Sequence, residues 1–253
     1  MASVVLPLVV LCGVAGAAVG LGSGWLNTWL ERAEFDGGSG LVGERGPAVE
    51  ADGANGDDGD DGDDGDDGDE ADEVIYGWTW LEWAVSPALG AVLFALFAVR
   101  TSNPLLLAED LLWVAVFIQI STFDMRHRLI LDVVTYPAIV LALILAAVTP
   151  GLSFLPALTG AGVIGIFLLL FSVVTRGGVG FGDVKLGCLI GAITGISFGT
   201  AQYQAGDAMA FGFLAGGAVA VLLLVTCRRG LHEAIPYGAF LCAGALIVMW
   251  QTL

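Results

Sequence analysis

Charged residues are scarce in this sequence and unevenly spread. Only 14% of the 253 residues are charged, against 57% that are hydrophobic, and several windows of about twenty residues carry no charge at all. A soluble domain needs charged residues along each of its surface helices, so this absence argues against that class of protein. Together with a mean hydropathy of +0.83, it predicts a protein that crosses a membrane several times.

We expect an all-α polytopic membrane protein with about eight transmembrane helices. Apolar windows predict spans near residues 4–26, 78–99, 106–123, 133–149, 154–174, 185–199, 207–226 and 237–252. The sixth window is short and rich in glycine, and the eighth ends at the C-terminus, so seven spans are the alternative. Apolar sequence continues beyond the first window and no basic segment precedes it, which favours a retained helix over a cleaved secretory signal.

Basic residues are few, and their positions predict an orientation. Eight of the nine fall in alternate connections between the predicted spans, and Arg100 alone falls on the other side. The eight are Arg32, Arg45, Arg126, Arg128, Arg176, Lys185, Arg228 and Arg229. Since connections rich in Lys and Arg face the cytoplasm, the N-terminus is expected outside a cell membrane. Asp124 and Asp183, from different connections, then both lie on the cytoplasmic side, where they can meet.

Acidic residues are concentrated in one segment. Of the 26 acids, 18 lie between Glu31 and Glu73, where Asp-Asp-Gly repeats run over residues 57–69, and they dominate the net charge of −17. We expect a disordered cytoplasmic loop over 31–76, between a first transmembrane helix in 1–30 and a membrane-embedded domain over 77–253. The loop lacks the spacing of an EF-hand, which favours weak, nonspecific cation binding over a specific calcium site.

Cysteine and histidine offer little support for a metal site. The four cysteines lie far apart in or beside apolar spans, no C-x-x-C pair occurs, and we expect them to be small buried hydrophobes. They are Cys12, Cys188, Cys227 and Cys242. The two histidines, His127 and His232, lie near span ends, where an interfacial role is favoured over metal ligation. No metal is therefore expected.

Two aspartates at the edges of separate apolar segments carry the functional prediction. Asp124 follows the third predicted span and Asp183 precedes the sixth. A carboxylate close to hydrocarbon is costly, so its presence there indicates function. Two carboxyl groups in hydrogen-bonding range share one proton, which lets one act as a base toward water and the other as an acid. Such a pair can hydrolyse a peptide bond.

Four segments follow one another in the order found in a known family. Residues 180–186 read G-F-G-D-V-K-L, which fits the pattern G-x-G-D-x-K-L throughout. Residues 124–132 read D-M-R-H-R-L-I-L-D, with Leu131 where that family's pattern has proline. Residues 236–241 read P-Y-G-A-F-L, with Ala239 in place of a second proline, and Trp25-Leu26-Asn27 is followed by Arg32. With these segments the chain resembles the type IV prepilin peptidases and archaeal preflagellin peptidases, intramembrane aspartic proteases with a G-x-G-D motif.

The resemblance implies roles for individual residues, and makes 77–253 an aspartic peptidase domain. Asp124 and Asp183 are expected to be catalytic, and Asp132 is expected to support them. On a single helix, eight positions would place Asp132 about 80° around from Asp124, so that both face one cavity. Gly180, Gly182 and Lys185 are the candidate substrate-binding residues, although anchoring at the lipid headgroups is favoured for Lys185. A simple Gly-rich turn is the alternative for the two glycines, and a phosphate-binding loop is excluded because no strand precedes them and an acid follows.

The resemblance also implies substrates and cofactors. The substrate would be a prepilin, pseudopilin or preflagellin with a short basic leader, a small residue such as Gly at the cleavage point and then an apolar helix. No cofactor is expected for proteolysis, and S-adenosylmethionine only if the family's N-methyltransferase activity is retained. Bacterial members normally have two cysteine pairs in the first cytoplasmic loop, which are associated with metal binding and with methylation. This chain lacks them, as the archaeal members do, so proteolysis is favoured over methylation. Membrane lipids are the other expected partners, with no nucleic acid, and no oligomeric state is predicted.

Two other functions compete with proteolysis. A proton-coupled transporter also keeps acids in its spans, but it usually holds them near the membrane midplane and is built from two related halves. Here both acids lie beside basic connections and the sequence shows no internal repeat. A catalytically silent component of a pilus or secretion assembly is the third candidate, and it would tolerate the loss of either aspartate.

Overall fold

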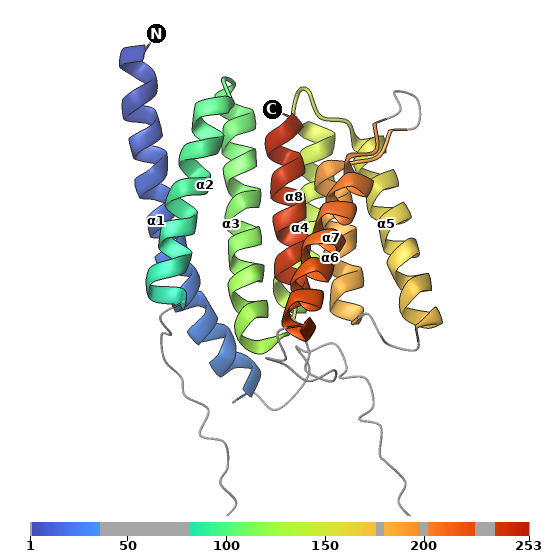
Figure 1. Cartoon of the computed structure of the whole chain (residues 1–253). Helices are drawn as coiled ribbons and strands as arrows, with labels where there is room; N and C mark the ends of the chain where they lie inside the picture. The colour runs from blue at the N-terminus through green and yellow to red at the C-terminus, as the bar shows by residue number, and fades with distance from the viewer. Residues whose placement is uncertain (1, 36–80, 176–179, 198–201, 226–235, 253) are drawn as a thin grey trace, which may run out of the picture.

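The described part of the chain is helical, as the sequence predicts. A computed structural model describes residues 2–35, 81–175, 180–197, 202–225 and 236–252, and these ranges contain no β-strand (Figure 1). The helices are α1 Ala2–Phe35, α2 Ser86–Arg100, α3 Pro104–His127, α4 Asp132–Val148, α5 Phe154–Val174, α6 Phe181–Thr194, α7 Gln204–Val225 and α8 Tyr237–Thr252. A π-helical turn, Leu81–Val85, leads into α2.

Successive helices run up and down through one bundle, so that the start of α1 and the end of α8 lie at the same end (Figure 1). Five described segments are long and apolar enough to cross a membrane: most of α1, residues 83–100 of the π-helical turn and α2 together, α3, α5 and most of α7. The apolar helices α4 and α8 are shorter, with 17 and 16 residues. With 14 residues, α6 rises only about 21 Å. The described residues thus contain the eight helices of the predicted multi-pass architecture.

Three helix boundaries differ from the sequence prediction in ways that matter for the site. Helix α1 continues to Phe35, so Glu31 belongs to a helix and not to the acidic segment. Helix α6 begins at Phe181 and therefore includes Asp183 in its first turn. Helix α3 continues to His127 and therefore includes Asp124, while Asp132 begins α4, so the single-helix geometry considered for these two acids does not apply. Residues 36–80, with the Asp-Asp-Gly repeats, lie outside the described residues.

Neighbouring helices form close pairs where glycine replaces a side chain. Helices α1 and α2 touch at Gly16 and Gly90, and α5 and α6 touch at Gly160 and Gly191. In both pairs a Cβ atom on either glycine would overlap the carbonyl oxygen of its partner, and α7 and α8 approach equally closely at Gly244. In lipid, helices are held together by van der Waals packing and not by exclusion of water, so close backbone approach of this kind stabilises the bundle.

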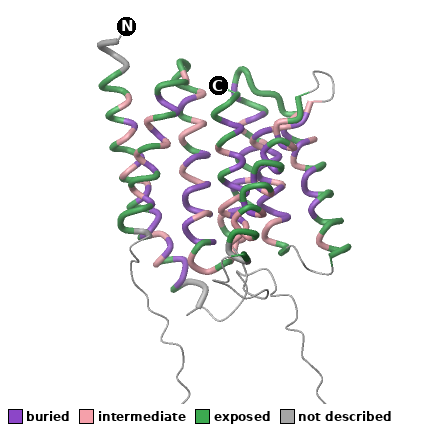
Figure 2. The backbone as a smooth tube through the Cα atoms, in the orientation of Figure 1, coloured by how far each residue is buried: buried purple, intermediate pink, exposed green. Residues whose placement is uncertain are grey.

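The best-buried side chains lie where α3, α6 and α8 face one another. Phe117 of α3, Leu186 of α6 and Leu241 of α8 are at most 1% exposed. Figure 2 shows the buried residues turned toward the interior of the bundle, while the outer helices expose apolar surface. The helices that carry the functional candidates thus have well-packed interiors, which restricts how far those side chains can move.

The glycine contact between α5 and α6 can be tested with two neighbouring positions. We expect Gly160→Ala to lower the apparent Tm of the purified protein in detergent, because the added methyl group meets the backbone of Gly191 and overpacking of this kind costs about 1–3 kcal/mol. Gly162→Ala, on the exposed face of the same helix with nothing near its Cβ, is the control and should leave Tm unchanged or raise it. Equal effects of both substitutions would contradict the packing argument.

Candidate active site

Asp124 lies in the last turn of α3 and is buried. Its residue is 4% exposed. The helix begins with Asn103, whose side chain accepts a hydrogen bond from Leu105 N, and it ends at Arg128 in the left-handed conformation with φ 55°. The Asp124 carboxylate accepts a hydrogen bond of 3.0 Å from the backbone N–H of Ala239. The N–H of Gly238 donates to it as well. Both donors belong to the first turn of α8, where backbone N–H groups have no partner within the helix.

Asp183 lies in the first turn of α6, at the same end of the bundle as Asp124 (Figure 1). Gly180 caps the helix in an extended conformation, and its N–H donates to the Asp183 carboxylate. The side chain is partly buried and lies in electrostatic range of the Asp124 carboxyl group. The fold therefore brings together the two acids that the sequence predicted to meet, from residues 59 positions apart in the sequence.

Lys185 and Asp132 form an ion pair that joins the two sequence segments. The Lys185 Nζ atom donates to both carboxylate oxygens of Asp132 at 2.7 Å, and the Lys185 residue is only 6% exposed. The ammonium group also lies over the rings of Tyr136, at 4.9 Å, and Phe181, at 4.6 Å. The expectation that Lys185 anchors the span at the headgroups is therefore wrong, because its charge is held inside the protein by the first residue of α4.

The glycines before Asp183 differ in what surrounds them. A Cβ atom on Gly180 would make ordinary contact, 3.6 Å from an oxygen of Asp183. A Cβ atom on Gly182 would instead lie 3.1 Å from the Cβ atom of Ile130, in the connection between α3 and α4. The space beside Gly182 is thus filled by Ile130, a residue that the sequence did not single out.

Glu31 is a second residue that the sequence analysis missed. Its side chain is fully buried, and its Oε1 atom lies 3.0 Å from Arg126 Nη1 and 2.6 Å from His127 Nε2. One turn earlier, Asn27 accepts a hydrogen bond from Gln119 Nε2, so α1 is joined to α3 at two successive turns. The spacing of four residues between Asn27 and Glu31 could have predicted this contact, because it places both side chains on one face of a helix. Arg126 and His127, at the end of α3, hold this buried carboxylate.

The described cysteines behave as expected. Cys12 and Cys242 are buried and Cys188 is half-buried, while Cys227 and His232 lie outside the described residues. Cys242 lies one turn along α8 from Gly238, in electrostatic range of Asp124 and Asp183. Within the described ranges, no three His, Cys, Asp or Glu side chains are grouped as a metal site requires.

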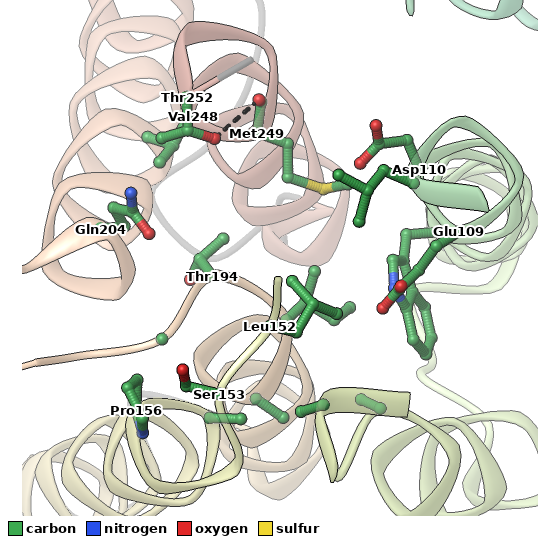
Figure 3. A pocket seen from close by; sticks show the side chains of 18 of the residues that line it. Glu109, Asp110, Leu152, Ser153, Pro156, Thr194, Gln204, Val248, Met249 and Thr252 are labelled. Carbon is green, nitrogen blue, oxygen red and sulfur yellow. Dashed lines mark hydrogen bonds between the residues drawn. The ribbon is translucent and has the colours of Figure 1, made fainter. Parts of the chain in front are cut away.

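A pocket in the described residues lies at the opposite end of the bundle. It has a volume of about 370 Å³ and is lined by the first turns of α3 and the C-terminal ends of α4, α6 and α8. Figure 3 shows Glu109 and Asp110 on one side of it and Thr194 and Gln204 on the other. Since Asp124 and Asp183 lie at the far ends of their helices from this pocket, it is not part of the candidate active site.

The ion pair between α4 and α6 yields a stability prediction. Lys185→Met leaves the Asp132 carboxylate without its partner. Because the side chain of Asp132 is 22% exposed, we expect the loss of this partly buried pair to cost about 1–3 kcal/mol. Asp132→Asn should be destabilising too. In the double variant neither charge remains, so we expect its loss of apparent Tm in detergent to be smaller than the sum of the two single losses. Additive losses would show that the pair makes no energetic contribution.

Comparisons with known proteins find similarity over the segments that form the candidate site. Residues 111–227 match the model of the type IV leader peptidase family, a range that includes Asp124, Asp132, Asp183 and Lys185. The chain is also 26% identical over 157 residues to the prepilin leader peptidase/N-methyltransferase of Bacillus subtilis (strain 168), and the match covers 62% of this chain. It spans 61% of the length of that relative. No solved structure matches the chain. Residues 111–227 are therefore similar to the type IV leader peptidase family.

Proposed function

We propose that this protein is an intramembrane aspartic endopeptidase that removes the short basic leader of type IV prepilins, pseudopilins or preflagellins. The observation that carries the proposal is the convergence of Asp124 and Asp183 at one end of the bundle, inside a range that matches the type IV leader peptidases. The name of the Bacillus subtilis relative points to the same class of substrate.

The chemistry follows from the surroundings of the two acids. Two carboxyl groups within hydrogen-bonding range cannot both ionise easily, so we expect this pair to hold one proton between them when substrate is bound. The ionised carboxyl takes a proton from water as the water oxygen attacks the scissile carbonyl, and the protonated carboxyl donates to that carbonyl oxygen. On collapse of the tetrahedral intermediate the C–N bond breaks, the carboxyl that took the proton from water gives it to the leaving amine, and the other carboxyl takes a proton back from a hydroxyl group of the intermediate. The N–H groups of Gly238 and Ala239 orient the Asp124 carboxylate during these steps.

The positions of the basic residues support a cytoplasmic active site, which is part of the proposal. Four of the five described basic residues, Arg32, Arg126, Arg128 and Lys185, belong to the helix ends nearest the two acids, and Arg100 lies at the opposite end. By the positive-inside rule the acids then face the cytoplasm and the start of α1 faces outward. The apolar helix of a substrate would lie beside the bundle with its leader at this end, where an extended peptide bond is accessible to water.

Methylation of the new N-terminus is a separate part of the proposal. We expect proteolysis without a cofactor, and S-adenosylmethionine would be required only if the chain also methylates its product. The absence of the two cysteine pairs from the sequence favours proteolysis alone. Membrane lipids are the other partners that we propose, on the basis of the exposed apolar surface of the outer helices.

The roles of the two acids can be tested by removing one carboxylate at a time. We expect Asp124→Asn and Asp183→Asn each to reduce leader removal at least about 100-fold, because each variant lacks one partner of the general acid–base pair. The measurement is mass spectrometry of the pilin N-terminus after co-expression with a prepilin from the same genome. The same spectra show whether the terminus carries a methyl group.

Asp207→Asn is the matched control for this experiment. Asp207 is an exposed aspartate in the first turn of α7, at the other end of the bundle, so its substitution should leave processing unchanged. Immunoblots of the membrane fraction confirm that all variants accumulate equally. Normal processing by either active-site variant would overturn the assignment of the catalytic pair.

A further inference from the structure

The last two turns of α1 hold one face of α3 near its C-terminal end (Figure 1). Three contacts follow one another along this face: a hydrogen bond from Gln119 to Asn27, the apolar packing of Phe123 with Leu30, and the pairing of Arg126 and His127 with Glu31. Residues three or four positions apart lie on one side of a helix, so these contacts form a continuous line. Asp124 lies on the neighbouring face, about 100° around α3 from Phe123.

Asp124 belongs to the part of α3 that depends most on support from outside the helix. The helix ends at His127, and the carbonyl oxygen of Asp124 accepts the closing hydrogen bond, 2.8 Å from the backbone N of Arg128. Because helix ends fray, a change in this last turn would move the Asp124 carboxyl group relative to Asp183. The contacts with Glu31 hold the two residues that lie directly before the Arg128 cap.

Stability alone does not account for Glu31. Its side chain is 0% exposed, and its Oε1 atom alone pairs with both Arg126 and His127. The Oε2 atom is buried and has no hydrogen-bond partner among the described residues, which costs free energy. A buried ion pair can often be replaced by apolar side chains of similar volume without loss of stability. Geometry is the better explanation, because two contacts to one fixed oxygen atom hold the last turn of α3 in one orientation.

We propose that Glu31 is a positioning residue for the candidate active site, and that it fixes Asp124 relative to Asp183 through Arg126 and His127. This inference rests on the proposed peptidase function and deepens it. It gives α1 a part in proteolysis, although α1 lies outside residues 111–227, the range that matches the leader peptidases. Since Glu31 acts through the last turn of α3 and not on the substrate, its loss should lower kcat and leave KM unchanged.

The test measures kcat and KM for leader removal from a prepilin of the same genome, in proteoliposomes, per folded molecule and well below the apparent Tm. We expect Glu31→Leu to lower kcat by about 10- to 100-fold, since a shift of about 1 Å in a reacting group can cost about 100-fold. Glu31→Gln keeps an oxygen acceptor at the same place and should recover most of this loss.

A double variant separates positioning from stability. Glu31→Leu combined with Arg126→Leu removes both charges of the pair, so we expect its Tm to lie above that of Glu31→Leu alone and the variant to accumulate even where the single variant does not. Its kcat should stay low, because no ion pair fixes the last turn of α3. Recovery of kcat together with Tm would overturn the inference, since a merely structural role predicts that result.

Ser23→Ala is the matched control on the same helix. The hydroxyl group of Ser23 is buried and lies 2.9 Å from that of Ser86 in α2, so this variant removes a contact of α1 that does not involve α3. We expect a lower Tm and an unchanged kcat. An equal fall of kcat in Ser23→Ala and Glu31→Leu, or no fall in Glu31→Leu, would contradict the positioning role. If the unaltered protein removes no leader, the proposed function itself fails, and with it the role of Glu31.

Discussion

The hydrogen bonds from the start of α8 to the Asp124 carboxylate are the interaction on which the rest of the site depends. A carboxylate that is 4% exposed is costly unless it is hydrogen-bonded, and the free N–H groups of a helix N-terminus meet that requirement without any further side chain. These hydrogen bonds also join the end of α3 to the beginning of α8 at the same end of the bundle. Asp183 lies at the N-terminus of α6 in a similar environment, so two helix N-termini point into one site.

Asp183 is held in place from two directions. The glycine contact between Gly160 and Gly191 fixes α6 against α5, and the ion pair of Lys185 with Asp132 fixes its first turn against α4. Because α6 is a short helix of 14 residues, small shifts along or around it would move Asp183 directly. Close backbone packing and one partly buried ion pair thus act together on the position of a single carboxyl group.

Much of this arrangement follows from sequence patterns, and the remainder depends on contacts between distant residues. Apolar windows were enough to predict the helices, and the distribution of basic residues was enough to place Asp124 and Asp183 at one end. The burial of Glu31 was not predicted, because the residue was counted with the acidic segment that follows it, and only the packing of α1 against α3 supplies Arg126 and His127 as partners. Lys185 was assigned to the headgroups because a lysine at a span end usually reaches outward, and its partner is 53 residues away.

The structure gives a reason for alanine at position 239. In the sequence, Ala239 stands where the pattern of the resembled family has a proline. In the structure its N–H donates to Asp124, which a proline could not do. The position of Ile130 could not be predicted from the sequence, since its contacts are with two glycines in other helices.

The most direct test of the account is whether positions 124 and 183 face each other across one site in the membrane. Each can be changed to cysteine in a chain whose four native cysteines are replaced by alanine, and membranes can then be treated with a short bifunctional thiol reagent. The account predicts an intramolecular crosslink between positions 124 and 183, and none between 183 and 207 at the opposite end. Failure of the first pair to crosslink while both cysteines remain reactive would contradict the convergence of the two acids.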